Sequence, residues 1–224
     1  MNLALFDLDD TLIPIDSDHA WGDFTTHLGW TDADSFKRQN DAFFRRYATG
    51  ALDIREYVRF ATAALREHGP VAAAAAQARF LAEVVEPVIT PQALALLQAH
   101  RAAGDTLAIV TSTNEWVTRP IAVRLGVGEL IAIRLRRDAH GWITGEIDGT
   151  PSFREGKVTR VAEWLRMRGL GWTDARITFY SDSINDLPLM LRAQQPVATN
   201  PDARLRAIAL ARGWRILDLF DSLS

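Results

Sequence analysis

Near its amino end the chain reads Leu3-Ala4-Leu5-Phe6-Asp7-Leu8-Asp9-Asp10-Thr11, and this segment indicates the fold class. Its first four residues are apolar, and a cluster of carboxylates with one hydroxyl follows them directly. A short apolar run that ends in a polar cluster is typical of a buried parallel strand whose carboxyl end opens onto a site. We therefore predict a strand over residues 3–6, with Asp7, Asp9 and Thr11 at the edge of the sheet where ligands bind.

The second half of the chain repeats this pattern after Pro91. Predicted helices alternate there with apolar runs that indicate strands, at residues 106–110, 130–135, 142–147, 176–180, 196–198 and 214–217. The runs at 130–135 and 142–147 alternate in a way that suggests a hairpin or an edge extension. Strands separated by helices of this length predict an α/β fold, a Rossmann-like parallel sheet with helices on both faces.

A different pattern interrupts the sheet after its first strand. From Ser17 to about Val85, apolar residues recur at helical spacing, and no alternation typical of strands is present. We predict an inserted α-helical cap domain over residues 16–86, with residues 1–15 and 87–224 forming the core domain.

Composition excludes several classes of protein. The chain has 224 residues, 48% of them apolar and 24% charged, which indicates a folded globular protein. It contains no cysteine, so disulfides, thiolate zinc sites and a cysteine nucleophile are excluded. A net charge of −3 without a basic run argues against nucleic acid as a partner. No apolar stretch reaches the ~20 residues of a membrane helix, so we expect a cytoplasmic protein without a membrane partner. Its oligomeric state is left open.

The residues at the predicted strand ends carry the chemistry. Carboxylates such as Asp7, Asp182 and Asp186 form a hard oxygen site suited to Mg²⁺, which usually takes one or two protein carboxylates plus phosphate oxygens. The ammonium of Lys157 and the hydroxyl of Thr111 can neutralise the remaining charge of a phosphoryl group. The pattern therefore favours a site for a phosphorylated small molecule.

The first two carboxylates suggest a mechanism. An aspartate such as Asp7 is a competent nucleophile toward phosphorus and gives an aspartyl-phosphate. Asp9 lies two residues on, on the same side of an extended strand. There it can protonate the leaving alcohol and then deprotonate the hydrolytic water. We predict phosphoryl transfer through Asp7, with Asp9 as general acid and base.

These residues resemble the four motifs of the haloacid dehalogenase superfamily of phosphohydrolases, in the same order. The matching segments are Asp7-Leu8-Asp9-Asp10-Thr11, Thr111 after an apolar strand, Lys157, and Asp182-Ser183-Ile184-Asn185-Asp186. The position of the helical insert resembles the cap of the phosphoserine-phosphatase-like subgroup.

The resemblance implies a role for each matching residue. It implies that Asp7 is the nucleophile and a Mg²⁺ ligand, and that Asp9 is the acid/base and a Mg²⁺ ligand through its carbonyl. Asp182 is implied as a metal ligand with Asp186 in support. The phosphate binders that we expect are Thr11, Thr111, Ser112, Lys157 and Asn185.

The cap contains the candidate specificity residues. Phosphoserine phosphatases carry a glutamate where this chain has Asp16, and their cap arginine has no certain counterpart, with Arg45, Arg46 and Arg55 as candidates. Asp16 and Asp18 make the start of the cap acidic, which suggests an amine-bearing substrate, although either residue could instead cap a helix. Histidinol phosphate and phosphoserine are the two candidates, and the departure at Asp16 favours histidinol phosphate.

Three alternatives to a phosphomonoesterase share part of this pattern. A phosphotransferase or mutase of the same superfamily would carry all four motifs. A dehalogenase would have no need of Asp9. A receiver-like signalling module also has an acidic Mg²⁺ site with a phosphorylated aspartate, but it is much shorter and has no inserted cap.

Overall fold

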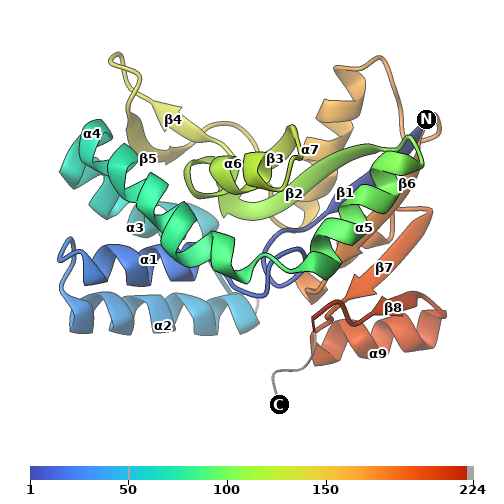
Figure 1. Ribbon diagram of the computed structural model, residues 1–224, viewed down its shortest axis with the longest axis horizontal. Coiled ribbons are helices and arrows are strands. Elements are labelled where there is room, and N and C mark those ends of the chain that lie inside the picture. The colour runs from blue at the N-terminus through green and yellow to red at the C-terminus, as the bar shows by residue number, and fades with distance from the viewer. Residues whose placement is uncertain (50, 221–224) are drawn as a thin grey trace.

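The computed structural model of the protein describes residues 1–49 and 51–220. Its centre is a six-stranded sheet of order β3-β2-β1-β6-β7-β8, in which all neighbouring strands are parallel (Figure 1). This confirms the predicted α/β fold. The strands of this sheet are β1 (Asn2–Phe6), β2 (Thr106–Asn114), β3 (Glu129–Ile133), β6 (Arg176–Ser181), β7 (Gln195–Thr199) and β8 (Arg215–Leu217).

Helices cover both faces of the sheet because its central strands are apolar on both sides. In β1, Leu3 and Leu5 contact one apolar cluster, whereas Ala4 and Phe6 contact the other. Helices α5 and α6 pack on the Phe6 side, and α7, α8 and α9 pack on the Leu5 side. Their bounds are α5 (Pro91–Ala102), α6 (Glu115–Arg124), α7 (Glu155–Arg166), α8 (Leu187–Met190) and α9 (Ala203–Arg212), with a short 3₁₀ turn, η3 (Ile184–Asp186), before α8.

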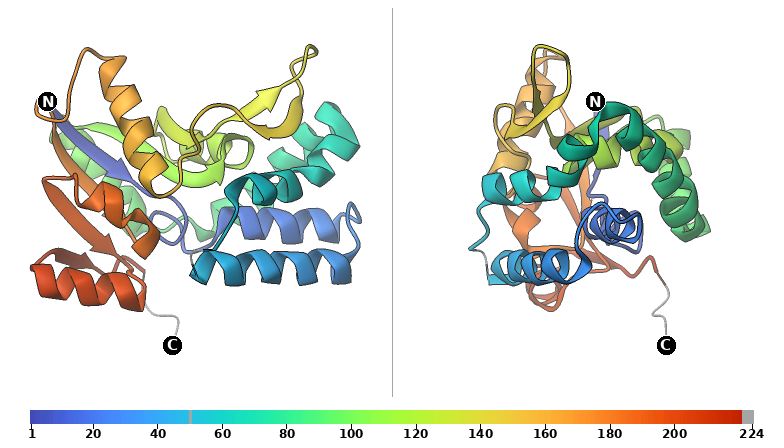
Figure 2. Two further views of the ribbon diagram at one scale, coloured as in Figure 1. Left: turned by 180° about the vertical axis from the view of Figure 1, so that it is seen from behind. Right: turned by 90° about the vertical axis from the view of Figure 1, so that its left-hand side faces the viewer.

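The inserted helices lie beyond the carboxyl ends of the strands (Figures 1 and 2). Their apolar side chains belong to the same cluster as Phe6, and Phe80 packs against Trp21 and Phe24 with ring centroids 5.2 and 5.6 Å away. The helical cap is thus packed onto the core. Its elements are α1 (Ser17–His27), α2 (Ala33–Thr49), α3 (Ile54–Ala61), α4 (Ala63–Phe80), a π-helical turn η1 (Leu81–Val85) and a 3₁₀ turn η2 (Glu86–Val88). We keep residues 16–86 as the proposed cap domain and residues 1–15 with 87–224 as the proposed core domain.

Local sequence signals explain several boundaries. Asp16 accepts hydrogen bonds from the first turn of α1, and Asp53 does the same for α3. Gly69 breaks α4 with φ +75°, a value that few residues other than glycine adopt, and Pro70 begins its second part. No single helix of the described chain is both long and apolar enough to cross a membrane; the one combination that meets those criteria joins Ala63–Val88 to Pro91–Ala102 across a 91° bend.

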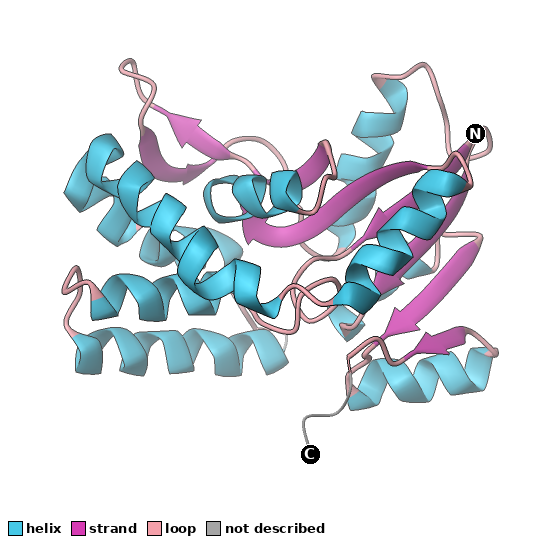
Figure 3. Ribbon diagram, viewed as in Figure 1, coloured by secondary structure: helices cyan, strands magenta, loops and turns pink. Residues whose placement is uncertain are grey.

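Two predicted strands differ from the structure. The run at 130–135 is divided, because β3 pairs with β2 in the main sheet while β4 (Leu135–Arg137) pairs antiparallel with β5 (Ile143–Ile147) in a separate hairpin (Figure 3). Strand β2 does not end at Val110 but continues to Asn114, with a register shift between these two residues. Thr111, Ser112 and Thr113 therefore lie within an irregular last part of the strand, which can direct their hydroxyls toward the site.

Candidate active site

The segment after β1 is a tight loop that brings two carboxylates to one cavity. The amide of Asp7 donates to the carbonyl of Tyr180 at 2.9 Å, which continues the pairing of β1 with β6. The carbonyl of Leu8 then accepts hydrogen bonds from the amides of residues 11–13, at 2.8–3.3 Å. Because the chain turns back at this point, Asp7 and Asp9 both line the same cavity.

Lys157 links the first motif to the last. Its side chain, only 1% exposed, donates to Asp7 Oδ1 at 3.1 Å and to Asp186 Oδ2 at 2.7 Å. The hydroxyl of Ser181 donates to the same Asp186 oxygen at 2.8 Å. Burial alone would lower the pKa of Lys157, but the carboxylates of Asp186 and Asp7 raise it, so the ammonium stays charged.

Lys157 is positioned by a close contact between the backbone of Gly156, in the first turn of α7, and that of Pro151, in the loop before it. A Cβ atom on Gly156 would lie 2.0 Å from the carbonyl oxygen of Pro151, so only glycine fits at this position. Arg154 has φ 52° and ψ −122°, a strained conformation for a residue with a side chain. Its Nε donates to Asn185 Oδ1 at 3.1 Å, which joins this loop to the fourth motif.

Asp9 is held by donors from both domains. Its Oδ1 accepts from the amide of Ser17 at 2.8 Å, and its Oδ2 accepts from the hydroxyl of Thr113 at 2.8 Å and from that of Thr111 at 3.5 Å. Burial, followed by the negative charge of Asp16, raises the pKa of Asp9 to about 6. The cap and β2 therefore fix the orientation of this carboxyl group before any ligand arrives.

Thr11 and Asp182 form a reciprocal pair. The Thr11 hydroxyl donates to Asp182 Oδ1 at 3.0 Å and accepts from the Asp182 amide at 3.1 Å. Thr11 is fully buried and is not among the described residues that line the cavity. The structure thus places Thr11 behind Asp182, where it orients that carboxylate, and not at the position of a direct phosphate contact.

The site has an excess of negative charge that suits a divalent cation. Burial and the neighbouring carboxylates of Asp186, Asp182 and Asp9 raise the pKa of Asp7 well above its usual range, and the single ammonium of Lys157 opposes them only in part. Within the described chain, no three carboxylate or imidazole groups gather closely enough to hold a metal ion by themselves. Mg²⁺ usually takes one or two carboxylates and completes its coordination with water and phosphate oxygens, so the donors present fit this ion.

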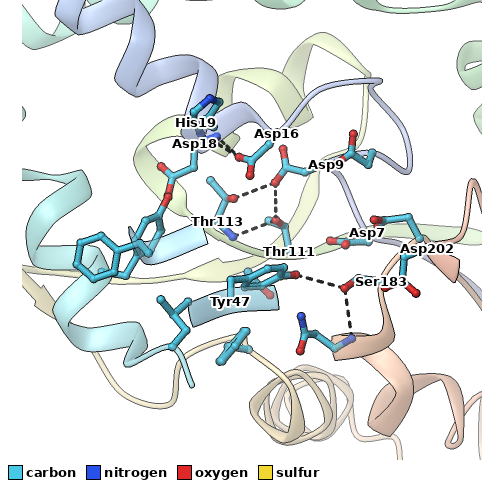
Figure 4. Close-up of a pocket in the computed structure, with 18 of the residues that line it drawn as sticks. Asp7, Asp9, Asp16, Asp18, His19, Tyr47, Thr111, Thr113, Ser183 and Asp202 are labelled. Atoms are coloured by element: carbon cyan, nitrogen blue, oxygen red, sulfur yellow. Dashed lines mark hydrogen bonds between the residues drawn. The ribbon is translucent and has the colours of Figure 1, made fainter. Parts of the chain in front are cut away.

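A cavity of about 420 Å³ extends from these carboxylates to the cap. Figure 4 shows Asp7, Ser183 and Asp202 at one side of it, and Asp18 and His19 from α1 at the other. Its volume is that of a site for a small metabolite. The cavity is lined from the cap by Asp16, Asp18, His19, Asn40, Phe43, Tyr47, Leu52, Ile54 and Tyr57, and from the core by Asp7, Asp9, Asp10, Thr111, Ser112, Thr113, Phe153, Asp182, Ser183, Asn185, Asp202, Ala203 and Arg204.

The two acidic cap residues have different environments. Asp16 is exposed, and its Oδ1 accepts from the amides of Asp18 and His19 at 3.0 and 2.9 Å, as a helix cap does. Asp18 is 7% exposed and hydrogen bonds with the side chains of Asn114 and Tyr57. Burial, and then the charge of Asp16, raises the pKa of Asp18 to about 7.

Comparison with known proteins agrees with this geometry. The sequence profile of the haloacid dehalogenase-like hydrolases matches residues 4–191. The chain belongs to this family. It is 41% identical to a histidinol-phosphatase of Neisseria meningitidis over 218 residues, which cover 97% of this chain and 98% of that protein. The chain is a phosphatase of the haloacid dehalogenase family, which overturns the alternative of a non-catalytic receiver-like module.

Solved structures show the same fold. A protein of unknown function from Bordetella pertussis superposes with a TM-score of 0.92 at 47% identity, covering 98% of this chain and 99% of that one. A substrate-bound phosphoserine phosphatase superposes with a TM-score of 0.67 at 17% identity, covering 96% of this chain and 92% of that one. The second likeness shows the fold alone, a family core with a helical cap.

The structure brings most of the predicted site residues of this phosphatase together. Thr11, Lys157 and Asp186 are buried and are not among the described residues that line the cavity. Ser112 and Asn185 line the cavity, as do Asp16 and Asp18. Neither Arg45 nor Arg46 is among its described lining residues; both are exposed on α2, where Arg46 pairs with Glu56 at 2.6 Å. The geometry therefore gives no support to either arginine as a substrate contact.

Several residues at the site had no signal in the sequence that would have identified them. Thr113 is not one of the residues predicted for the site, yet it makes the shorter threonine contact with Asp9. Tyr47 crosses from the cap to the fourth motif, with its hydroxyl 3.3 Å from Ser183 Oγ (Figure 4). The side-chain oxygen of Asn114 caps α6, while the side-chain nitrogen of the same residue donates a hydrogen bond to Asp18.

Proposed function

We propose that the protein is a Mg²⁺-dependent phosphomonoester hydrolase that works through an aspartyl-phosphate on Asp7. The observation that supports this most is that Asp7 and Asp9 line one cavity. Lys157 donates a hydrogen bond to Asp7, and Asp9 accepts hydrogen bonds from Thr113 and Ser17. A nucleophile, an acid/base and a fixed positive charge are the parts that stepwise phosphoryl transfer requires.

The first step forms a bond between an Asp7 carboxylate oxygen and phosphorus and breaks the bond from phosphorus to the ester oxygen. Asp9, in its protonated form, gives its proton to the departing alkoxide, so that an alcohol leaves. In the second step Asp9 takes a proton from water as the water oxygen attacks phosphorus. The bond from phosphorus to Asp7 breaks, and inorganic phosphate is released with both carboxyl groups restored.

The remaining residues position the phosphoryl group and its charge. Lys157 and Thr111 would bind its oxygens, with Ser112 and Asn185 at the cavity wall as further donors. Asp7 and Asp182, with the carbonyl of Asp9 and with Asp186 in support, would hold Mg²⁺. The ion would supply charge neutralisation at the transferring group. Thr11 keeps Asp182 in place through the reciprocal hydrogen bonds described above.

We propose histidinol phosphate as the substrate. Its organic half carries an ammonium and an imidazole and has no carboxylate, whereas phosphoserine carries a carboxylate beside its ammonium. The described cap lining contains two carboxylates, Asp16 and Asp18, and the only guanidinium among the described lining residues, Arg204, belongs to the core. The similarity to the Neisseria histidinol-phosphatase supports the same choice.

Release of inorganic phosphate tests this proposal directly. The purified protein is assayed with histidinol phosphate, phosphoserine and 4-nitrophenyl phosphate, each with Mg²⁺ and with excess EDTA. We expect phosphate release that requires Mg²⁺ and the highest kcat/KM for histidinol phosphate. Transfer of the phosphoryl group to an added alcohol in place of water would identify a phosphotransferase instead, and no release from any ester would refute the proposal.

A further inference from the structure

Asp18 is a buried carboxylate that faces the cavity without a positively charged partner. It lies in the first turn of α1, is 7% exposed, and lines the cavity on the side away from Asp7 (Figure 4). None of the ion pairs formed by the described residues includes it. A buried carboxylate is normally paired with a cation, because burial of an unpaired charge is costly.

The neutral groups around Asp18 fix its position and do not neutralise its charge. Asn114 Nδ2 donates to Asp18 Oδ1 at 3.1 Å, and the hydroxyl of Tyr57 is its second hydrogen-bond partner. A carboxylate has about four acceptor positions, so these two partners leave capacity for a ligand. Asn114 is itself held as the cap of α6, and Tyr57 is fixed by an edge contact with Phe43 at 5.4 Å. The carboxylate is therefore oriented in advance.

Asp16 does not provide an equivalent group. One of its oxygens already accepts from two amides of α1, and its side chain is exposed. The two acidic residues at the start of the cap thus have separate roles, a helix cap and a group available to a ligand.

We infer that Asp18 is the specificity-determining residue of this phosphatase and binds the positively charged half of the substrate, with Asn114 and Tyr57 as its positioning residues. The inference rests on the proposed function, because it requires that the phosphoryl group of the same molecule lies at Asp7. The aromatic rings of Phe43 and Tyr57 beside this carboxylate suit a planar cation such as imidazolium.

The test compares kcat/KM for histidinol phosphate with kcat/KM for phenyl phosphate, which has no cation. We expect Asp18→Asn to lower the ratio of the two values by roughly 10- to 100-fold, the scale of a hydrogen bond to a charged group. Tyr57→Phe should lower the ratio by roughly 3- to 10-fold, because one neutral hydrogen bond is lost. Asp53→Asn is the matched control and should leave the ratio unchanged, because Asp53 is an exposed helix cap that is not among the described residues lining the cavity.

Each outcome separates the inference from the proposed function. Wild-type protein that hydrolyses neither ester would refute the function. Wild-type protein that hydrolyses both with equal kcat/KM, an unchanged ratio in Asp18→Asn, or an equal fall in the ratio for Asp53→Asn and Asp18→Asn, would overturn the inference and leave the function standing. Circular dichroism confirms that each variant is folded. If Asp18→Asn does not fold, an unchanged ratio in Tyr57→Phe still overturns the inference.

Discussion

Replacement of Asp18 by asparagine should make the free protein more stable while it weakens binding of the substrate cation. Asparagine has nearly the same shape and can keep hydrogen bonds to Asn114 and Tyr57, but it cannot ionise. The cost that it removes is that of holding a carboxylate in a site where only 7% of the residue's surface is exposed.

The size of the effect follows from the pKa of this group. Burial, and then the charge of Asp16, raises the pKa of Asp18 from 3.8 to about 7 in the folded protein. A raised carboxyl pKa adds stability that is present in full below about pH 4 and is lost as the pH rises to about 7. At about 1.4 kcal/mol per pH unit, the loss is at most about 4 kcal/mol. We therefore expect the free energy of unfolding of Asp18→Asn to exceed that of the wild type by about 2–4 kcal/mol at pH 8 and to equal it near pH 4.

Urea unfolding of both proteins at several pH values between 4 and 8, without substrate, measures this difference. Asp53→Asn is the matched control, because Asp53 is an exposed helix cap and asparagine caps helices about as well as aspartate. A difference between Asp18→Asn and the wild type that does not change with pH would show that the pKa of Asp18 is not raised in the folded protein. A gain of the same size in Asp53→Asn would show that the effect is not specific to Asp18.

The other predictions concern the chemistry of the site. Asp9→Asn should lower kcat for an alkyl phosphate by about 10²–10⁴-fold, the scale of a lost general acid/base, and an unchanged kcat would remove Asp9 from that role. Thr113→Val should lower kcat by about 3- to 10-fold with little change in KM, because Asp9 loses a neutral hydrogen bond; a change in KM alone would contradict this. Gly156→Ala should lower the free energy of unfolding, measured by thermal unfolding, by about 1–3 kcal/mol, since the added Cβ would lie 2.0 Å from the Pro151 oxygen. It should lower kcat as well, because the shift displaces Lys157. Unchanged unfolding would show that the loop adapts.

The residues that could be predicted from the sequence are those attached to strand ends. Asp7 follows β1 and Asp182 follows β6, and the carboxyl ends of parallel strands meet at one edge of the sheet. Their proximity therefore follows from the fold class alone. Thr11 belongs to the same motif, but its side chain points behind Asp182, and the direction of a side chain in a turn cannot be obtained from its spacing.

The cap side of the cavity could not be predicted because its contacts join distant segments. Asp18 and Asn114 are 96 residues apart, and Tyr47 and Ser183 are 136 residues apart. Sequence position singled out Asp16 as the counterpart of the glutamate in phosphoserine phosphatases, and only burial and hydrogen bonds distinguish it, as a helix cap, from the more deeply buried Asp18. Arg45 and Arg46 directly precede Tyr47 of the cavity lining in the sequence, but both side chains are exposed on α2.

The most direct test of the mechanism is to isolate the phosphorylated protein during turnover. The protein is mixed with histidinol phosphate and Mg²⁺, quenched in acid within one turnover, digested, and analysed by mass spectrometry, with Asp7→Asn as the control. We expect one added phosphoryl group on the peptide that contains Asp7, formed at least as fast as phosphate is released, and none in the control. A wild-type protein that turns over without any phosphorylated Asp7, or with the phosphoryl group on another residue, would contradict this mechanism.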